Sequence, residues 1–506
     1  MGARSRTRAA STGTARDVPW TPVRVAAVAL LAVSVLLLLA VGTAGESAAK
    51  PGLGPAGDLV GVGLLSFWAP GPALVTGMLW AAYGLGAVGV LLHLRFGLPR
   101  LPGWPATPFW LRALGVLVAA LVYASLSPFG SADHTNYAAY GRIAVLGGDP
   151  WLTAPNTWPG HDPVISAVRP PWDGTASIYG PFATLLQILA SWVGGDNLRD
   201  TVWVWLTVCL LAWLAVPSLL VSAGAPPSRV RALWTANPLI LGVGLLGAHV
   251  DTVAAALVVL TIWAAPRSAW AAGLFAGLTV STKVTAGVVV LAVLVAWWTH
   301  GRREFASRAG QFVGVALVTV GALHWWAGSH VFDQLDRARR SISLATPWRP
   351  LFEALAGPLG GSGARNLVAV LSVVVALVLV VVLTRLTRGL APATVVGASA
   401  RWTFVLATAY ALAAAYSLPW YVLTSWALLP VLAASVLDRA MLLHLFAVTV
   451  AYVPGRVEAM TPAVERVTLW VRRVPVPYAV LAVWAWLTLA AVRGSRRPSS
   501  PRPPAP

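Results

Sequence analysis

The sequence has 506 residues, of which 58% are hydrophobic and only 10% are charged, with a mean hydropathy of +0.73. A soluble domain carries about 25% charged residues, so this composition excludes an ordinary soluble protein. Lysine and arginine exceed aspartate and glutamate by 19, but no hydrophilic segment is long enough to form a basic nucleic-acid-binding domain. The single cysteine, Cys209, leaves no disulfide framework or cysteine metal site within the sequence.

Residues 1–22 are basic and polar and precede a long apolar run, which predicts a cytoplasmic tail followed by a retained signal anchor. In hydrocarbon each backbone group must pair within its own helix, so repeated apolar runs predict an all-α polytopic membrane protein, with a transmembrane domain over 23–492. The Pro-rich residues 493–506 predict a disordered cytoplasmic tail. The apolar runs begin near residues 23, 70, 110, 179, 201, 232, 250, 268, 284, 309, 366, 402, 419, 440 and 477.

The arginines predict the topology, because basic loops stay on the cytoplasmic side. They cluster at Arg4, Arg6 and Arg8, at Arg95 and Arg100, in SAGAPPSRVR (222–231), GRREFASR (301–308) and TRLTRG (384–389), and in the C-terminal tail. If residues 179–195 crossed the bilayer, loop 222–231 and every later basic loop would lie outside. We therefore expect 179–195 to be re-entrant or interfacial, with about 14 spans and both termini cytoplasmic.

This topology places on one side of the membrane the polar residues that loop orientation does not explain. The segments that then face outward are the loop 129–178, GAHVD (247–251), Lys283, the loop 328–365 and SLPWY (417–421).

The stretch SADHTNYAAYGRIAVLGGDP (131–150) places Asp133, His134, Arg142 and Asp149 between apolar blocks. Helical spacing puts Asp133, Tyr137 and Gly141 on one face, and a carboxylate at the mouth of a span is placed to be desolvated and to act as a base. A plain helix N-cap is the alternative for Asp133, and spacing alone favours it. The prolines and tryptophans that follow, up to RPPWDGTASIYGP (169–181), predict a folded external binding loop for a flat or sugar-like ligand.

Two later segments place charges inside apolar surroundings. Asn237 opens a span that closes on His249 and Asp251, and charged groups at such depth usually face a cavity. Lys283 stands between two apolar runs. The alternatives are a satisfied interior histidine, a lysine that reaches the interface and, for the aromatic residues of SLPWYVLTSW (417–426), an interfacial belt.

In this order the motifs resemble the GT-C membrane glycosyltransferases, and within them the actinobacterial polyprenol-phosphate-mannose-dependent α-1,6-mannosyltransferases. The resemblance runs from about residue 110 to 430 and includes Asp133 with its tyrosines, GGDPW, YGP, NPL, GAHVD, the isolated Lys283 and PWY. GAHVD has Val250 where the family pattern has Asn, and Ala132 replaces the first carboxylate of an acidic pair found in some GT-C enzymes.

The resemblance implies a GT-C-like bundle at the plasma membrane that works as an inverting glycosyltransferase. It would move a mannosyl or other hexosyl unit from a polyprenyl-phosphate sugar to a cell-envelope glycan or glycolipid on the external side. No cofactor, metal ion or nucleic acid is expected, and the sequence has no GxxxxGK[ST] motif. A transporter or lipid flippase is the rival class, although the sequence shows no convincing internal repeat.

The same resemblance assigns roles to residues. Asp133 matches the general base. The candidates for the donor phosphate are Lys283 and His249, which lie at motif positions, and Arg142, which does not. The expected substrate-binding residues are Tyr137, Tyr140, Asp149, Trp172, Tyr179, Asn237, Asp251, Trp420 and Tyr421.

Overall fold

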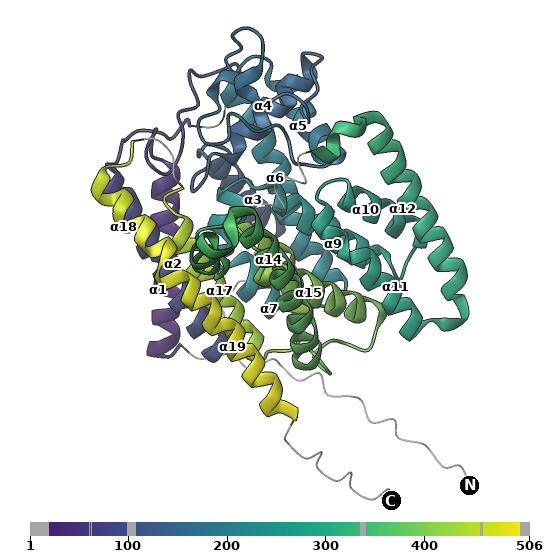
Figure 1. The fold of residues 1–506 in the computed structure, drawn as a ribbon. Helices are drawn as coiled ribbons and strands as arrows, with labels where there is room; N and C mark the ends of the chain where they lie inside the picture. The colour runs from purple at the N-terminus through teal and green to yellow at the C-terminus, as the bar shows by residue number, and fades with distance from the viewer. Residues whose placement is uncertain are drawn as a thin grey trace, which may run out of the picture.

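The computed structural model describes residues 20–59, 61, 63–98, 108–333, 341–455 and 459–495 (Figure 1). Within these ranges the chain is helical, without a β-strand and with only two isolated bridges, Ala44 to Trp68 and Ser47 to Lys50. The all-α prediction is confirmed. Arg100, most of the predicted tail 1–22 and most of the tail 493–506 lie outside the described residues.

Among the described residues before 231, the α-helices begin within three residues of a predicted apolar run, except for the fourth and the seventh. They are α1 (Pro22–Gly42), α2 (Pro72–Phe96), α3 (Phe109–Ala124), α4 (Asp133–Val145), α5 (Pro181–Gly194), α6 (Leu198–Ser222) and α7 (Pro227–Val230). Prolines begin α1, α2, α5 and α7, because the first helical position needs no backbone N–H and suits the fixed φ of proline. Two 3-10 turns, η2 (Pro155–Thr157) and η3 (Ile165–Ala167), lie in the loop between α4 and α5.

The second part of the chain begins with two π-helical segments, η4 (Arg231–Thr235) and η5 (Leu241–Leu246), on either side of α8 (Pro238–Ile240). The helices that follow are α9 (Val250–Ala264), α10 (Ala269–Val280), α11 (Val288–His300), α12 (Phe305–Ala327), α14 (Trp348–Leu386), α15 (Val395–Ala413), α16 (Leu423–Leu428), α17 (Val436–Tyr452), α18 (Pro462–Arg473) and α19 (Pro475–Ser495). The 3-10 turns among them are η6 (Val284–Gly287), η7 (Arg302–Glu304), η8 (Ser329–Phe332), η9 (Pro419–Val422) and η10 (Leu429–Val431).

The number of membrane spans differs from the expected 14 or so. In the described part of the chain seven helices are long and apolar enough to cross a bilayer, or eight if the bent pair Pro238–Leu246 and Val250–Ala264 forms one span. Other apolar runs form helices of 10–17 residues, among them Pro181–Gly194 and Ala269–Val280. A straight crossing needs about 20 residues, so length and composition do not confirm the higher number.

The predicted loop 328–365 is partly helical, which the sequence analysis missed. Helix α14 begins at Trp348 and continues across Pro358 to a kink at Gly360, whose φ is +69°. Proline and glycine usually end a helix, but here the helical turns resume directly after the kink. The kink separates two helical parts, and the apolar run that was expected to begin near residue 366 lies in the second of them.

Helices α4 and α5 lie together at one end of the molecule, and α6 leads from there toward α7 at the opposite end (Figure 1). Helices α4 and α5 pack so closely that a Cβ at Gly141 would collide with the carbonyl group of Gln187. This close approach explains why glycine occupies the face of α4 that also carries Tyr137. Whether α5 stays outside the bilayer remains a prediction.

Candidate active site

A cavity of about 140 Å³ lies where α4, the loop before α5, the start of α9 and the turn η9 meet. It collects most of the residues that the sequence singled out. The predicted residues that line it are Asp133, Tyr140, Trp172, Tyr179, Asp251, Lys283, Trp420 and Tyr421.

Asp133 is the first residue of α4, and its side chain is 15% exposed. Ala132, not Asp133, occupies the N-cap position, and no side chain caps this helix, so the capping alternative is wrong. The hydroxyl of Tyr137 donates to Asp133 Oδ2 at 3.5 Å, and His249 Nδ1 lies 3.3 Å from the same oxygen. Both contacts involve Oδ2, which leaves Oδ1 available to a ligand.

His249 owes its position to a sharp bend between two helical segments. Segment η5 and helix α9 meet at an angle of 106°, and Ala248 between them has a φ of +54°, which is rare for a residue with a side chain. His249 follows as the N-cap residue of α9 and is 2% exposed. Its ring stacks on Trp420, with centroids 3.5 Å apart and planes 14° apart. This stacking holds the imidazole against Asp133.

Asp251 and Lys283 form the charged pair of the cavity. The Lys283 ammonium donates to Asp251 Oδ1 at 2.6 Å and lies 3.9 Å from the centroid of the Tyr421 ring. Asp251 is buried, and its second oxygen, Oδ2, has no hydrogen-bond partner in the part of the chain that the structure describes. A buried carboxylate oxygen without a partner is costly, which marks Asp251 as a candidate functional residue in the cavity wall.

Aromatic rings form the walls. Tyr137 packs edge-on against Tyr179, with ring centroids 5.1 Å apart, and Trp420 packs edge-on against Tyr452 at 4.9 Å. The hydroxyl of Tyr140 donates to Thr175 O at 2.9 Å and thereby ties α4 to the long loop. Burial raises the pKa of Tyr140, so its hydroxyl keeps its proton at neutral pH.

Three predicted site residues lie away from this cavity. Arg142 donates from Nε to Asp162 Oδ2 at 2.8 Å. Asp149 accepts from the backbone N–H of Trp151 and is 2.7 Å from His330 Nδ1. Asn237 is fully buried and accepts from Leu239 N as the N-cap of α8. The structure gives these three side chains roles in holding the backbone.

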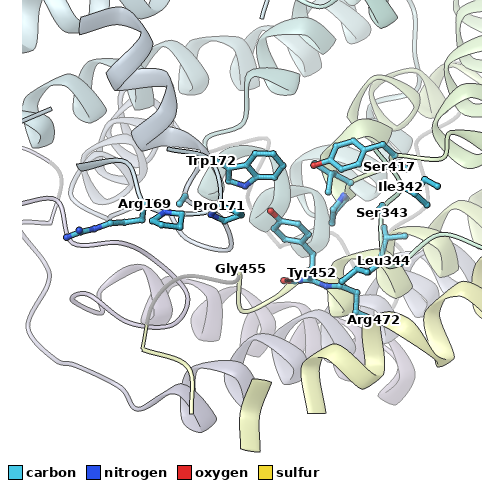
Figure 2. A pocket seen from close by; sticks show the side chains of 17 residues that line it. Arg169, Pro171, Trp172, Ile342, Ser343, Leu344, Ser417, Tyr452, Gly455 and Arg472 are labelled. Carbon is cyan, nitrogen blue, oxygen red and sulfur yellow. Dashed lines mark hydrogen bonds between the residues drawn. The ribbon is translucent and has the colours of Figure 1, made fainter. Parts of the chain in front are cut away.

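The sequence analysis missed residues in a second cavity of about 270 Å³, which shares Trp172, Tyr416, Leu418 and Tyr452 with the first. Figure 2 shows this cavity, with Trp172 and Tyr452 on neighbouring sides. Arg472 of α18 donates to Ala451 O and Tyr452 O, both at 2.7 Å, at the end of α17. No motif marked Tyr452, because it ends an ordinary apolar helix.

A metal centre has no evident ligand set here. Among the described residues no three His, Cys, Asp or Glu side chains are grouped so that they could hold a metal ion. The charged groups that line the cavity are Asp133 and the Asp251–Lys283 pair.

Residues 29–300 match the family model of the alpha-(1->6)-mannopyranosyltransferase N-terminal domain. The chain belongs to this family. The matched range contains Asp133, His249, Asp251 and Lys283, so the charged residues of the cavity lie within the part of the chain that defines the mannopyranosyltransferase family.

Two individual proteins are similar to the chain. One, from Mycolicibacterium smegmatis, is described as a probable alpha-(1->6)-mannopyranosyltransferase and is 34% identical over 130 residues. That match spans 24% of this chain and 23% of the relative. The other is the crystal structure of ArnT from Cupriavidus metallidurans bound to undecaprenyl phosphate, with a TM-score of 0.43 and 16% identity over 78% of this chain and 77% of ArnT.

Proposed function

We propose that the protein is an inverting membrane glycosyltransferase that moves a mannosyl unit from a polyprenyl-phosphate sugar to a hydroxyl of a cell-envelope glycan or glycolipid on the external side of the plasma membrane. The observation that carries the proposal is the placement of Asp133. It leaves one carboxylate oxygen open toward an aromatic-walled cavity that also holds the Asp251–Lys283 pair. Membership in the alpha-(1->6)-mannopyranosyltransferase family supports the choice of sugar and linkage.

In the proposed reaction Asp133 is the general base. The acceptor hydroxyl donates its hydrogen bond to Asp133 Oδ1, and the proton moves to this oxygen as the hydroxyl oxygen attacks the anomeric carbon. The bond between that carbon and the phosphate oxygen breaks on the opposite face of the sugar. Its electron pair stays with the phosphate, which leaves on the lipid, so the configuration at the anomeric carbon inverts.

Tyr137 and His249 position the base in this scheme. Both contact Asp133 Oδ2, so they fix the rotation of the carboxylate and direct Oδ1 toward the acceptor. His249 was expected to bind the donor phosphate. Because it is buried, contacts Asp133 through Nδ1 and stacks on Trp420, we assign it instead to positioning Asp133.

Lys283 is the proposed ligand of the leaving phosphate. Its ammonium has three N–H donors, and Asp251 Oδ1 accepts only one of them. Asp251 and the ring of Tyr421 hold the ammonium at the cavity wall. The negative charge that develops on the phosphate would then meet a fixed cation in surroundings of low dielectric, where electrostatic stabilisation is strongest.

Purified protein in lipid vesicles tests the reaction. Labelled polyprenyl-phosphate mannose with an α-1,6-linked manno-oligosaccharide should give a product longer by one mannose, with the anomeric configuration opposite to that of the donor. A nucleotide-linked mannose should give none. Transfer from the nucleotide sugar alone, or with retained configuration, would contradict the proposal.

The external placement of the site has a separate test in a background that replaces the buried Cys209. Thr157 in the loop before α5 and Ser228 in α7 are both exposed, and each is changed to cysteine. If α5 does not cross the bilayer, a membrane-impermeant thiol reagent labels Thr157→Cys from outside and Ser228→Cys only from the cytoplasm. Labelling of both from the same side would place α5 across the bilayer.

A further inference from the structure

A third hollow, which we call the outer groove, lies beside the second cavity. Its volume is about 650 Å³. Three segments form its walls: residues 46–55 between α1 and α2, residues 161–169 in the long loop, and residues 196–198 at the start of α6. The helical bundle does not bury it, since Glu46, His161 and Asp196 in its walls are all exposed.

The outer groove is connected to the proposed site of transfer through shared walls. Arg169 lines both the outer groove and the second cavity. Trp172 and Tyr452 line both the second cavity and the cavity with Asp133. In Figure 2 the Arg169 side chain extends away from Trp172 and Tyr452. The three hollows therefore form a succession that begins at the catalytic carboxylate and ends at an open surface.

The chemistry of the outer groove favours an uncharged ligand with many hydroxyl groups. Its polar side chains include the carboxylates of Glu46 and Asp196, the amide of Asn197 and the imidazole of His161. Carboxylates accept hydrogen bonds from hydroxyls, and an amide both donates and accepts. Two carboxylates against one arginine, Arg169, disfavour a phosphate or another anion.

Hydrogen bonds hold the groove walls in place. Arg199 donates to Gly54 O at 2.7 Å, and Asp200 accepts from the backbone N–H groups of Asp58 and Leu59. On the opposite wall Asp162 accepts from Val164 N at 3.0 Å. A binding surface that is fixed in advance loses little entropy when a ligand binds.

We propose that the outer groove binds the part of a glycan acceptor that lies beyond the sugar being extended. The enzyme then elongates an existing oligosaccharide, whose end reaches Asp133 through the second cavity. This inference rests on the proposed function, because it needs the site of transfer to be at Asp133. It adds that the acceptor is recognised over several sugar units by Glu46 and Asp196.

Equilibrium binding of glycans to the purified full-length protein, without a donor, tests the groove independently of transfer. The wild type should bind a long α-1,6-linked manno-oligosaccharide more tightly than a single methyl α-mannoside. In the double variant Glu46→Gln, Asp196→Asn this preference should shrink by about tenfold, the equivalent of one or two hydrogen bonds. Ser166→Trp, which fills the groove from an exposed wall position, should also reduce it.

The matched control is Asp58→Asn. Asp58 is an exposed carboxylate in the same loop as Glu46 but does not line the groove, so this variant should keep the wild-type preference for long glycans. Equal affinity of the wild type for long and short glycans would overturn the proposal, as would an unchanged preference in the double variant and in Ser166→Trp. If length-dependent binding is found but no transfer occurs, the groove stands and the proposed reaction fails.

Discussion

Two pairs of aspartates at the same end of the molecule differ in how their oxygens are used. Asp162 accepts from Val164 N and Ile165 N through Oδ1 and from Arg142 through Oδ2. Asp149 likewise accepts from backbone N–H groups through Oδ1 and contacts His330 through Oδ2. Both oxygens of each carboxylate are therefore occupied by the protein itself.

The cavity aspartates each leave one oxygen without a partner. Asp133 contacts Tyr137 and His249 through Oδ2 alone, and Asp251 contacts Lys283 through Oδ1 alone. No hydrogen bond to the other oxygen of either residue is found in the residues that the structure describes. The difference separates carboxylates whose two oxygens hold a loop from carboxylates that keep one unpaired oxygen beside the cavity, which residue type and sequence position do not reveal.

The two sets of aspartates should differ most in the effect of removing the cation that each set contacts. Lys283→Met removes a charged donor from the cavity, so the KM for the lipid donor should rise by about 10- to 100-fold, as expected for a hydrogen bond to a charged group. Arg142→Met should leave this KM unchanged, because Arg142 pairs with Asp162 outside the cavity. Initial rates at varied donor concentration measure both. A larger effect for Arg142→Met would reverse the assignment of the two pairs.

A smaller effect is expected on the loop itself. Asp162→Ala leaves two backbone N–H groups and Arg142 without their acceptor, so the free energy of opening this segment should fall by about 1–3 kcal/mol. Hydrogen exchange of the amides around Val164 reports the change. Asp173→Ala, in the same loop, is the control, because its side chain makes no hydrogen bond within the described ranges. Equal effects of both variants would mean that the Asp162 bonds contribute little.

The smallest expected effect is a pH dependence of the contact between Asp149 and His330. The hydrogen bond with Asp149 raises the pKa of His330 above its usual value of 6.5. A histidine whose pKa is raised in the folded state contributes its full stabilisation below the pKa of the unfolded state. This stabilisation is lost as the pH rises through the pKa of the folded state. Proteolysis of the loop near Trp151 should therefore be slower at pH 6 than at pH 8. The pH dependence should disappear in His330→Gln, and its persistence there would assign it to another group.

Sequence patterns predicted the cavity best where a residue type is rare in its surroundings. Lys283, His249 and Asp251 stood out because charges are costly within apolar runs, and the structure brings them to Asp133. Proximity in sequence misled the assignment of Arg142. It follows Asp133 by nine residues, which is two and a half helical turns, so it lies on the opposite side of α4.

The helix starts were also largely predictable, because prolines and changes in polarity mark them. The kinked helix α14 was not, since Pro358 and Gly360 are typical of a loop, yet helical turns continue on both sides of them. Tyr452 carried no signal, because its place in the cavity depends on how α17 packs against residues more than 30 positions earlier in the chain, such as Trp420.

The transfer rates of Asp133→Asn and Asp149→Asn, measured side by side with saturating donor and acceptor, test the central claim most directly. Both changes keep the shape of the side chain and remove one negative charge. If Asp133 is the general base, its variant should lose about 10²-fold or more of the rate, whereas Asp149→Asn should keep most of it, because Asp149 lies outside the cavity. Retained activity in Asp133→Asn together with a loss in Asp149→Asn would contradict the account.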